Sequence, residues 1–301
     1  MSSQSIKSDL LLLLAALIWG FAFVAQRVGM EYMGPFTFNA VRFALGCLVL
    51  IPLIIYRKKK GSDQKLLQGS VNRLFFFFLS LLLGIILFAG TSLQQTGMVY
   101  TTAGNGGFIT GLYVVFVPIL GLFIGQKTGI PLWIGAMLAV AGLYFLSVGK
   151  NFTINKGDVF VFCCAIVWAF HVLYVGWLSP RTDPIKLSVI QYAICSFLSF
   201  IAAFLFENIS MNAILNGIWP VLYGGLLSVG IAYTIQVVAQ QTAHPSYVSI
   251  ILSMESLFAA IGGWLLLSEP LTGRGIAGGL LMLSGMIIAQ VKRKGRQKEK
   301  N

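Results

Sequence analysis

The chain has 301 residues, of which 57% are hydrophobic and 10% are charged, and its mean hydropathy is +0.85. Soluble domains carry roughly a quarter charged residues, so this composition excludes a soluble protein and leaves no stretch polar enough for a separate soluble domain. Much of the net charge of +12 lies in basic runs beside apolar segments, which is typical of cytoplasmic loops of membrane proteins rather than of a nucleic-acid-binding surface.

Ten apolar segments of membrane-spanning length follow one another along the chain. A helix of about 20 residues crosses the hydrocarbon layer, so ten such helices use nearly the whole chain and leave no room for an extramembrane catalytic domain. Short breaks of glycine, proline or charged residues separate them. The predicted spans are about 9–29, 36–56, 74–95, 100–124, 131–149, 158–178, 186–206, 216–238, 246–267 and 274–291.

The distribution of lysine and arginine predicts how these spans are oriented. With the N-terminus inside, the basic residues of 57–73 and of the tail from Lys292 are cytoplasmic, whereas Lys150, Lys156 and Arg274 are outside. This positive-inside bias predicts a multi-pass protein of the cytoplasmic membrane with an even number of spans and both termini in the cytoplasm.

The two halves of the chain repeat. Matched residues recur in the same order after 142 to 149 positions: Trp19 and Trp168, Pro35 and Pro184, Gln94 and Gln236, and Gly135 and Gly278. Five spans is an odd number, so the second unit is expected to enter the membrane upside down. The predicted fold is an all-α integral membrane protein of ten transmembrane helices in two inverted five-helix repeats, 1–150 and 151–301, with the substrate site near mid-membrane between them.

Several stretches carry a resemblance to a known family: ALIWGFAF in the first span, Arg42 early in the second, YTTAGNGGFITGLYVVFVP at 100–118, and SMESLFAAIGGWLLLSEPLT at 253–272 before a glycine-rich last span. Through them the chain resembles the drug/metabolite transporter superfamily in its ten-span EamA-like branch, over essentially its whole length. The resemblance implies export or exchange of small metabolites through a central cavity by alternating access. The family pattern has a proline after the acidic residue of the ninth span, where this chain has Ser256.

The first span presents Trp19, Phe23 and Gln26 on one helical face. An aromatic wall with an amide suits an amphipathic solute such as an amino acid or a planar metabolite. Packing of the two aromatic rings against neighbouring helices is the alternative. A buried amide needs hydrogen-bond partners, so Gln26 is the stronger candidate of the three.

Asn39 and Arg42 on the second span are three residues apart and are expected to project together. The forked guanidinium of Arg42 could bind a substrate carboxylate or pair with Glu255. The alternative is an arginine whose side chain extends to the outer membrane interface.

The third, fourth and eighth spans carry further polar candidates. Gln94 and Gln236, with Tyr233, are expected to line a symmetric cavity or to join helices by hydrogen bonds. On the fourth span, Asn105 is predicted to share the lining face with Thr101, Phe108 and Leu112.

Trp168 and His171 are neighbours on the sixth span. His171 is the imidazole placed to titrate inside the bundle, because histidine is the side chain that changes charge near neutral pH. A neutral, hydrogen-bonded histidine is the alternative.

Glu255 is the only one of the nine acidic residues that lies deep in a span, and its counterpart by the 143-residue displacement is Leu112. An ionisable group at that depth is costly, by about 2.5 kcal/mol or more, and often marks an ion or substrate path. Glu255 is therefore the candidate for coupling protons to transport, with substrate contact and a static pair as the alternatives.

These observations predict a secondary transporter of a small organic metabolite, an amino acid or a drug-like solute, that works as an exporter with the proton as a candidate coupling ion. A solute channel and a non-transporting membrane sensor or scaffold are the alternatives. An enzyme is not expected, because the chain has no HExxH motif and no metal-spaced Cys/His cluster. The expected partners are the solute and the lipid bilayer, with no cofactor, metal or nucleic acid.

Overall fold

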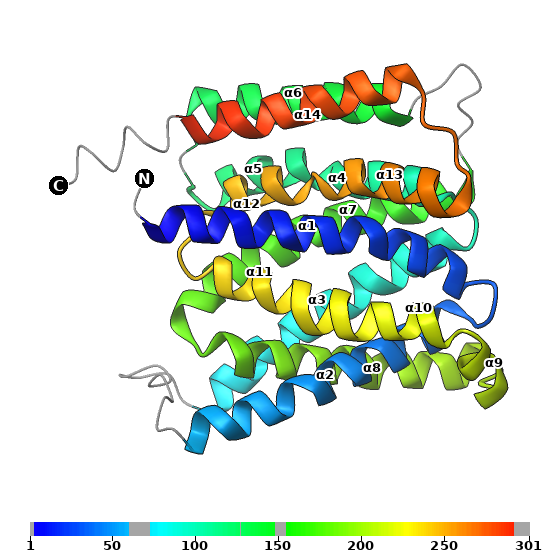
Figure 1. Cartoon of the computed structure of the whole chain (residues 1–301). Coiled ribbons are helices and arrows are strands. Elements are labelled where there is room, and N and C mark those ends of the chain that lie inside the picture. Colours follow the sequence, from blue (N-terminus) through cyan, green and yellow to red (C-terminus); the bar gives the residue numbers. More distant parts are fainter. Residues whose placement is uncertain (1–2, 60–72, 127, 148–154, 292–301) are drawn as a thin grey trace.

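The computed structural model describes residues 3–59, 73–126, 128–147 and 155–291, and these contain helices and turns but no strand. The helices are α1 Ser3–Gly29, α2 Pro35–Lys59, α3 Arg73–Met98, α4 Ala103–Gly111, α5 Tyr113–Phe123, α6 Ile130–Ser147, α7 Lys156–Leu178, η1 Ser179–Arg181, α8 Pro184–Phe206, α9 Met211–Asn216, α10 Ile218–Leu222, η2 Tyr223–Tyr233, α11 Thr234–Ala239, α12 Pro245–Leu252, α13 Glu255–Leu267 and α14 Gly273–Val291. The elongated helices lie side by side in one bundle (Figure 1).

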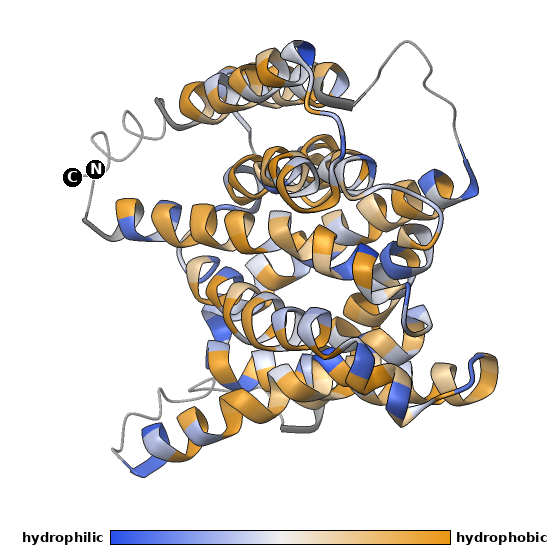
Figure 2. Cartoon of the chain, turned by 45° about the vertical axis from the view of Figure 1, so that its right-hand side comes forward, coloured by the Kyte–Doolittle hydropathy of each residue, from blue (hydrophilic) through white to orange (hydrophobic). Residues whose placement is uncertain are grey.

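Within these residues, eight helical segments are long and apolar enough to cross a membrane, and two shorter apolar helices cover Ile130–Phe145 and Gly273–Ala289. Each of the ten corresponds to a predicted span. Large apolar side chains face outward along the bundle, including Phe123, Phe204 and Trp219, each more than 70% exposed. Figure 2 shows hydrophobic residues along the helices and the strongly hydrophilic ones gathered toward their ends, as expected of a protein that lies in lipid.

The fourth and ninth predicted spans are interrupted rather than continuous. The first breaks at Leu112, between α4 and α5, and the second at Ser253 and Met254, between α12 and α13. The break in the ninth span forms without the family's proline, because the hydroxyls of Ser249 and Ser253 donate to carbonyls three residues earlier and so disturb the helical ladder. Broken helices at matching positions are a feature of transporter binding sites.

The eighth predicted span is also irregular, since its central part, η2, is an 11-residue π-helix. The wider turn changes which side chains face inward, and π-helical segments are often found at functional sites. Ser228 and Tyr233 of η2 both face the interior of the bundle.

Helices α6 and α14 pack together at one edge of the bundle, and α2 and α8 lie at the other (Figure 1). A Cβ atom on Gly135 would lie 2.6 Å from the carbonyl oxygen of Gly285, and one on Gly142 would lie 2.5 Å from that of Gly278. The earlier glycine of α6 thus meets the later glycine of α14, so the two helices run antiparallel. These glycines allow the backbones to approach closely, as small residues do between membrane helices.

Gly20 allows an equally close approach of α1 to α13. A Cβ atom there would lie 2.2 Å from Cβ of Phe258 and 2.8 Å from the carbonyl oxygen of Glu255. We expect Gly20→Ala to destabilise the protein by about 1–3 kcal/mol, because the added methyl group forces the helices apart. Thermal unfolding in detergent would measure this, with Gly273→Ala as the control, since nothing lies within 4 Å of a Cβ at Gly273. Equal melting temperatures for the two variants would contradict this packing.

Helix α1 begins and α14 ends on the same face of the bundle, here termed the termini face (Figure 1). The turns after α5, α7 and α11 lie on this face, and those after α1, α3, α8 and α13 lie on the opposite face. Most basic residues that predict the orientation, in 60–72, at Lys127 and Lys150 and from Lys292 onward, lie outside the described residues. The cytoplasmic position of the termini therefore stays a prediction.

Candidate functional site

A small cavity of about 30 Å³ lies at the centre of the bundle, large enough for about two water molecules. Nine of the twelve predicted site residues line it: Trp19, Phe23, Gln26, Arg42, Gln94, Trp168, Tyr233, Gln236 and Glu255. The cavity is too small for an organic solute, so the helices must move apart before one can enter.

The α1 wall of the cavity is fixed by hydrogen bonds to α3 and η2 and, through Gln94, to α7. Nε2 of Gln94 donates to Oε1 of Gln26 at 2.9 Å, and Nε1 of Trp168 donates to Oε1 of Gln94 at 2.8 Å. Nε1 of Trp19 donates to the carbonyl oxygen of Ser228 at 3.3 Å. The predicted face of Trp19, Phe23 and Gln26 thus lies on the cavity, and its amide has the buried partner that it requires.

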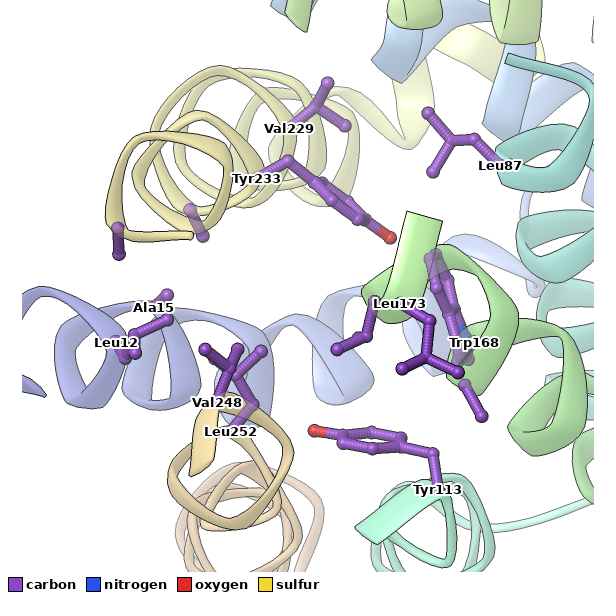
Figure 3. Packing of buried hydrophobic residues seen from close by; sticks show 14 of the residues in the cluster. Leu12, Ala15, Leu87, Tyr113, Trp168, Leu173, Val229, Tyr233, Val248 and Leu252 are labelled. Carbon is purple, nitrogen blue, oxygen red and sulfur yellow. The ribbon is translucent and has the colours of Figure 1, made fainter. Parts of the chain in front are cut away.

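Tyr233 lies at the centre of an aromatic cluster. Its ring centroid is 4.6 Å from that of Trp19, 5.8 Å from that of Trp168 and 6.0 Å from that of Phe43. Figure 3 shows the rings of Tyr113, Trp168 and Tyr233 extending from three different helices into the interior of the bundle. These polarisable rings form a wall suited to a planar or cationic group.

Arg42 is 2% exposed, so it does not extend to the membrane interface, and this alternative is wrong. Its Nε donates to Oδ1 of Asn39 at 3.0 Å, as their spacing predicts, and its guanidinium lies 5.3 and 5.1 Å from the rings of Phe38 and Phe43. It forms no ion pair with Glu255. Within the described residues, the only salt bridge joins Arg57 and Asp183. Among the residues that the structure describes, the buried guanidinium of Arg42 thus has no carboxylate partner.

Glu255 is 4% exposed and is the first residue of α13, directly after the break in the helix. The partly positive helix N-terminus favours a carboxylate there. Tyr113 is correspondingly the first residue of α5 and precedes Glu255 by 142 positions, so Tyr113 rather than Leu112 is its structural counterpart. The Tyr113 hydroxyl interacts electrostatically with Glu255 but has no hydrogen-bond partner of normal geometry.

Three predicted residues do not line the cavity. Asn39 lies behind it and holds Arg42, and Asn105 lies in the first turn of α4 at the opposite face. His171 is fully buried, with Nε2 3.1 Å from Oε1 of Gln191, and its ring packs edge-on against Trp168. This arrangement favours the neutral, hydrogen-bonded histidine.

Sequence reasoning missed Thr110, Tyr113 and Ser228, which also line the cavity. The predicted lining face of the fourth span, through Leu112, assumed a continuous helix, and the break rotates the residues that follow it. A displacement of 142 residues in place of 143 would have matched Tyr113 with Glu255 and so identified Tyr113 as a candidate site residue.

A second, larger cavity of about 970 Å³ opens at the termini face between the ends of α5 and α7 and the start of α12. Leu173, Gln240 and Pro245 are among its lining residues. Gln240, which lines this cavity, lies one helical turn, or about 6 Å along the helix axis, beyond Gln236, which lines the central one. Apolar side chains of Val172 and Leu252 lie at the end of the central cavity nearer this opening.

Comparisons with a family model, with curated proteins and with solved structures show what this chain is similar to. The EamA-like transporter family matches residues 6–148 and again 155–290. An uncharacterized transporter of Archaeoglobus fulgidus is 31% identical over 290 residues, covering 95% of this chain and 86% of that protein, and the uncharacterized transporter YoaV of Bacillus subtilis is 24% identical, covering 90% and 92%. A solved crystal structure has the same fold, with a TM-score of 0.73 at 17% identity over 94% of this chain and 96% of the other. The chain therefore belongs to the EamA-like transporter family of the drug/metabolite transporter superfamily and is a multi-pass membrane transporter.

Proposed function

We propose that the protein moves a small zwitterionic solute, of the amino-acid type, across the cytoplasmic membrane. One observation carries this proposal: Arg42 and Glu255 line the same buried cavity, yet neither forms an ion pair within the described residues. An uncompensated charge is costly inside a membrane protein, so each group favours a ligand of opposite charge. A solute that carries a carboxylate and an ammonium group satisfies both, and the aromatic wall accepts its side chain.

The transport mechanism that we propose is alternating access by two inverted five-helix repeats, 1–150 and 151–301, with ten spans in all. Two separate family matches, the antiparallel packing of α6 and α14, and the matching breaks at Leu112 and Ser253 support this arrangement. The pseudo-two-fold axis then passes close to the central cavity, and rocking of the repeats opens it to each side in turn.

Glu255 is proposed to bind either a proton or the ammonium group of the solute. A carboxylate that crosses the low-dielectric centre must be neutralised by one or the other, so the two ligands compete for it and their movements are coupled as antiport. The larger cavity opens toward the termini face, which supports loading from the cytoplasm and hence export if the termini are cytoplasmic.

Thermal-shift measurements with matched ligands test the solute class. Free amino acids with aromatic or large apolar side chains are expected to raise the melting temperature, because a ligand at about 100 times its Kd stabilises the folded state by about 2.7 kcal/mol. Their methyl esters, which lack the carboxylate, and their N-acetyl derivatives, which lack the ammonium group, should give much smaller shifts. Equal shifts from all three would contradict the zwitterion proposal, and a saturable counterflow of the active solute in proteoliposomes would separate a carrier from a channel.

A further inference from the structure

At the opposite face, a carboxylate joins the end of α13 to the beginning of α4. The backbone N–H of Ala103 donates to Oε1 of Glu269 at 2.9 Å, and that of Gly104 donates to Oε2 at 3.0 Å. Hydrogen bonds from a helix N-terminus to a carboxylate are charge-assisted and are strengthened by the helix dipole. Glu269 therefore closes the bundle between these two half-helices on this face.

The matching position at the termini face lacks the carboxylate and the first backbone donor of this contact. Gln126 follows α5 and precedes Glu269 by 143 positions, and Pro245 begins α12 at 142 positions after Ala103. An amide thus replaces the carboxylate, and a proline without an N–H replaces the first donor. The counterpart of the second donor, the N–H of Ser246, donates to Nδ1 of His244 at 3.3 Å instead. Oε1 of Gln126 has no hydrogen-bond partner within the described residues, and the cavity of about 970 Å³ lies between Gln126 and Pro245.

Helices α2 and α8, by contrast, are joined at both faces. Glu207 at the end of α8 accepts hydrogen bonds from the backbone N–H groups of Phe36 at 2.7 Å and Thr37 at 2.8 Å, both at the start of α2. At the termini face, Arg57 at the end of α2 lies 3.5 Å from Asp183, which caps α8. This pair is therefore fixed at its two ends, whereas the contact of Glu269 with the start of α4 has no counterpart between Gln126 and Pro245, both of which the structure describes.

We propose that Glu269 is the gate residue of the opposite face, and that Gln126 and Pro245 keep the resting protein open to the termini face. In the alternate state Glu269 releases α4, and the end of α5 closes on the start of α12. The difference in strength between the two contacts then sets which face is open in the absence of solute. This inference rests on the proposed alternating access but not on the identity of the solute.

Labelling of single cysteines tests the gate without any solute. In a background whose four native cysteines are replaced by alanine, Leu173→Cys reports on the termini-face cavity and Val24→Cys, buried beside Met98 and Ala103, reports on the interior behind Glu269. A hydrophilic maleimide should label Leu173→Cys at least about tenfold faster in detergent. Glu269→Gln should raise the labelling rate of Val24→Cys by about three- to tenfold, because a neutral amide is a weaker acceptor for helix N–H groups.

Glu207→Gln is the matched control, because it weakens a similar contact between α2 and α8, which are also joined at the termini face. It should change the labelling rate of Val24→Cys less than twofold. The double variant Gln126→Glu with Pro245→Ala adds the missing contact and should slow labelling of Leu173→Cys by a similar three- to tenfold. Because this second arm strengthens a contact, it does not depend on a variant that could fail to fold. The gate assignment is overturned if Glu269→Gln leaves the Val24→Cys rate unchanged, if Glu207→Gln raises it equally, or if the double variant leaves Leu173→Cys equally reactive.

Discussion

Arg42→Gln is expected to reduce transport of the solute by about 100-fold while leaving the folded protein about as stable as the wild type. A bidentate contact between a guanidinium and a carboxylate contributes about 3 kcal/mol, or about 100-fold in affinity. The same substitution removes a buried cation that has no carboxylate partner within the described residues, and this relieves a desolvation cost of several kcal/mol. The lost contacts with the rings of Phe38 and Phe43, about 1–2 kcal/mol each, offset that gain.

Counterflow in proteoliposomes would measure the loss of transport, and thermal unfolding would measure stability. Arg57→Gln is the matched control: Arg57 is a partly exposed arginine in a salt bridge with Asp183, and its loss should change transport less than about threefold. Arg42→Lys should give an intermediate rate, because it keeps the charge but loses the fork that matches a carboxylate. If Arg42→Gln unfolded in detergent but transported the solute at the wild-type rate when stabilised by lipid, Arg42 would be a structural residue.

Much of the fold could be predicted from the sequence, because hydrophobic length and helix-breaking residues are local signals. All ten predicted spans have a helical counterpart, and their ends agree with caps such as Asp183 and the capping box of Asn155 and Asp158. The breaks at Leu112 and Ser253 were not predicted, since they depend on serine hydroxyls and neighbouring helices rather than on a proline within the break. The π-helix Tyr223–Tyr233 has no hydrophobic signature of its own.

For the candidate site too, local patterns could be predicted from the sequence, whereas features set by packing could not. Residues chosen by helical spacing on one face, such as Trp19, Phe23 and Gln26, do lie together, because α1 is continuous. Asn105 was chosen by the same spacing on the interrupted fourth span, and His171 because an imidazole can titrate near neutral pH. Neither criterion tells a cavity residue from a polar residue that lies elsewhere in the bundle. The absence of an ion pair between Arg42 and Glu255, on which the proposed solute depends, follows from packing that no residue pattern reveals.

Glu255→Gln is expected to abolish the dependence of transport on a proton gradient and to reduce the remaining flux by about 10- to 100-fold. The neutral amide has nearly the shape of the carboxyl group but neither takes up a proton nor compensates an ammonium group, which is worth about 1.5–3 kcal/mol. In wild-type proteoliposomes, an acidic outer medium should accelerate efflux of the solute, because protons that enter exchange for solute that leaves.

The two roles proposed for Glu255 can be separated by the solute that is used. For a zwitterion, Glu255→Gln should lose both the gradient dependence and most of the flux, since proton and ammonium group share one carboxylate. An analogue with a hydrogen atom in place of the ammonium group should be carried by both proteins at similar low rates, without gradient dependence. A carboxylate introduced by Gln94→Glu is not expected to take over the role of Glu255, because Gln94 lies in a hydrogen-bonded chain with Gln26 and Trp168 that a second carboxylate would disrupt. If Glu255→Gln transported the zwitterion at the wild-type rate with the same response to the gradient, Glu255 would be structural, and another group would have to couple the proton to the solute.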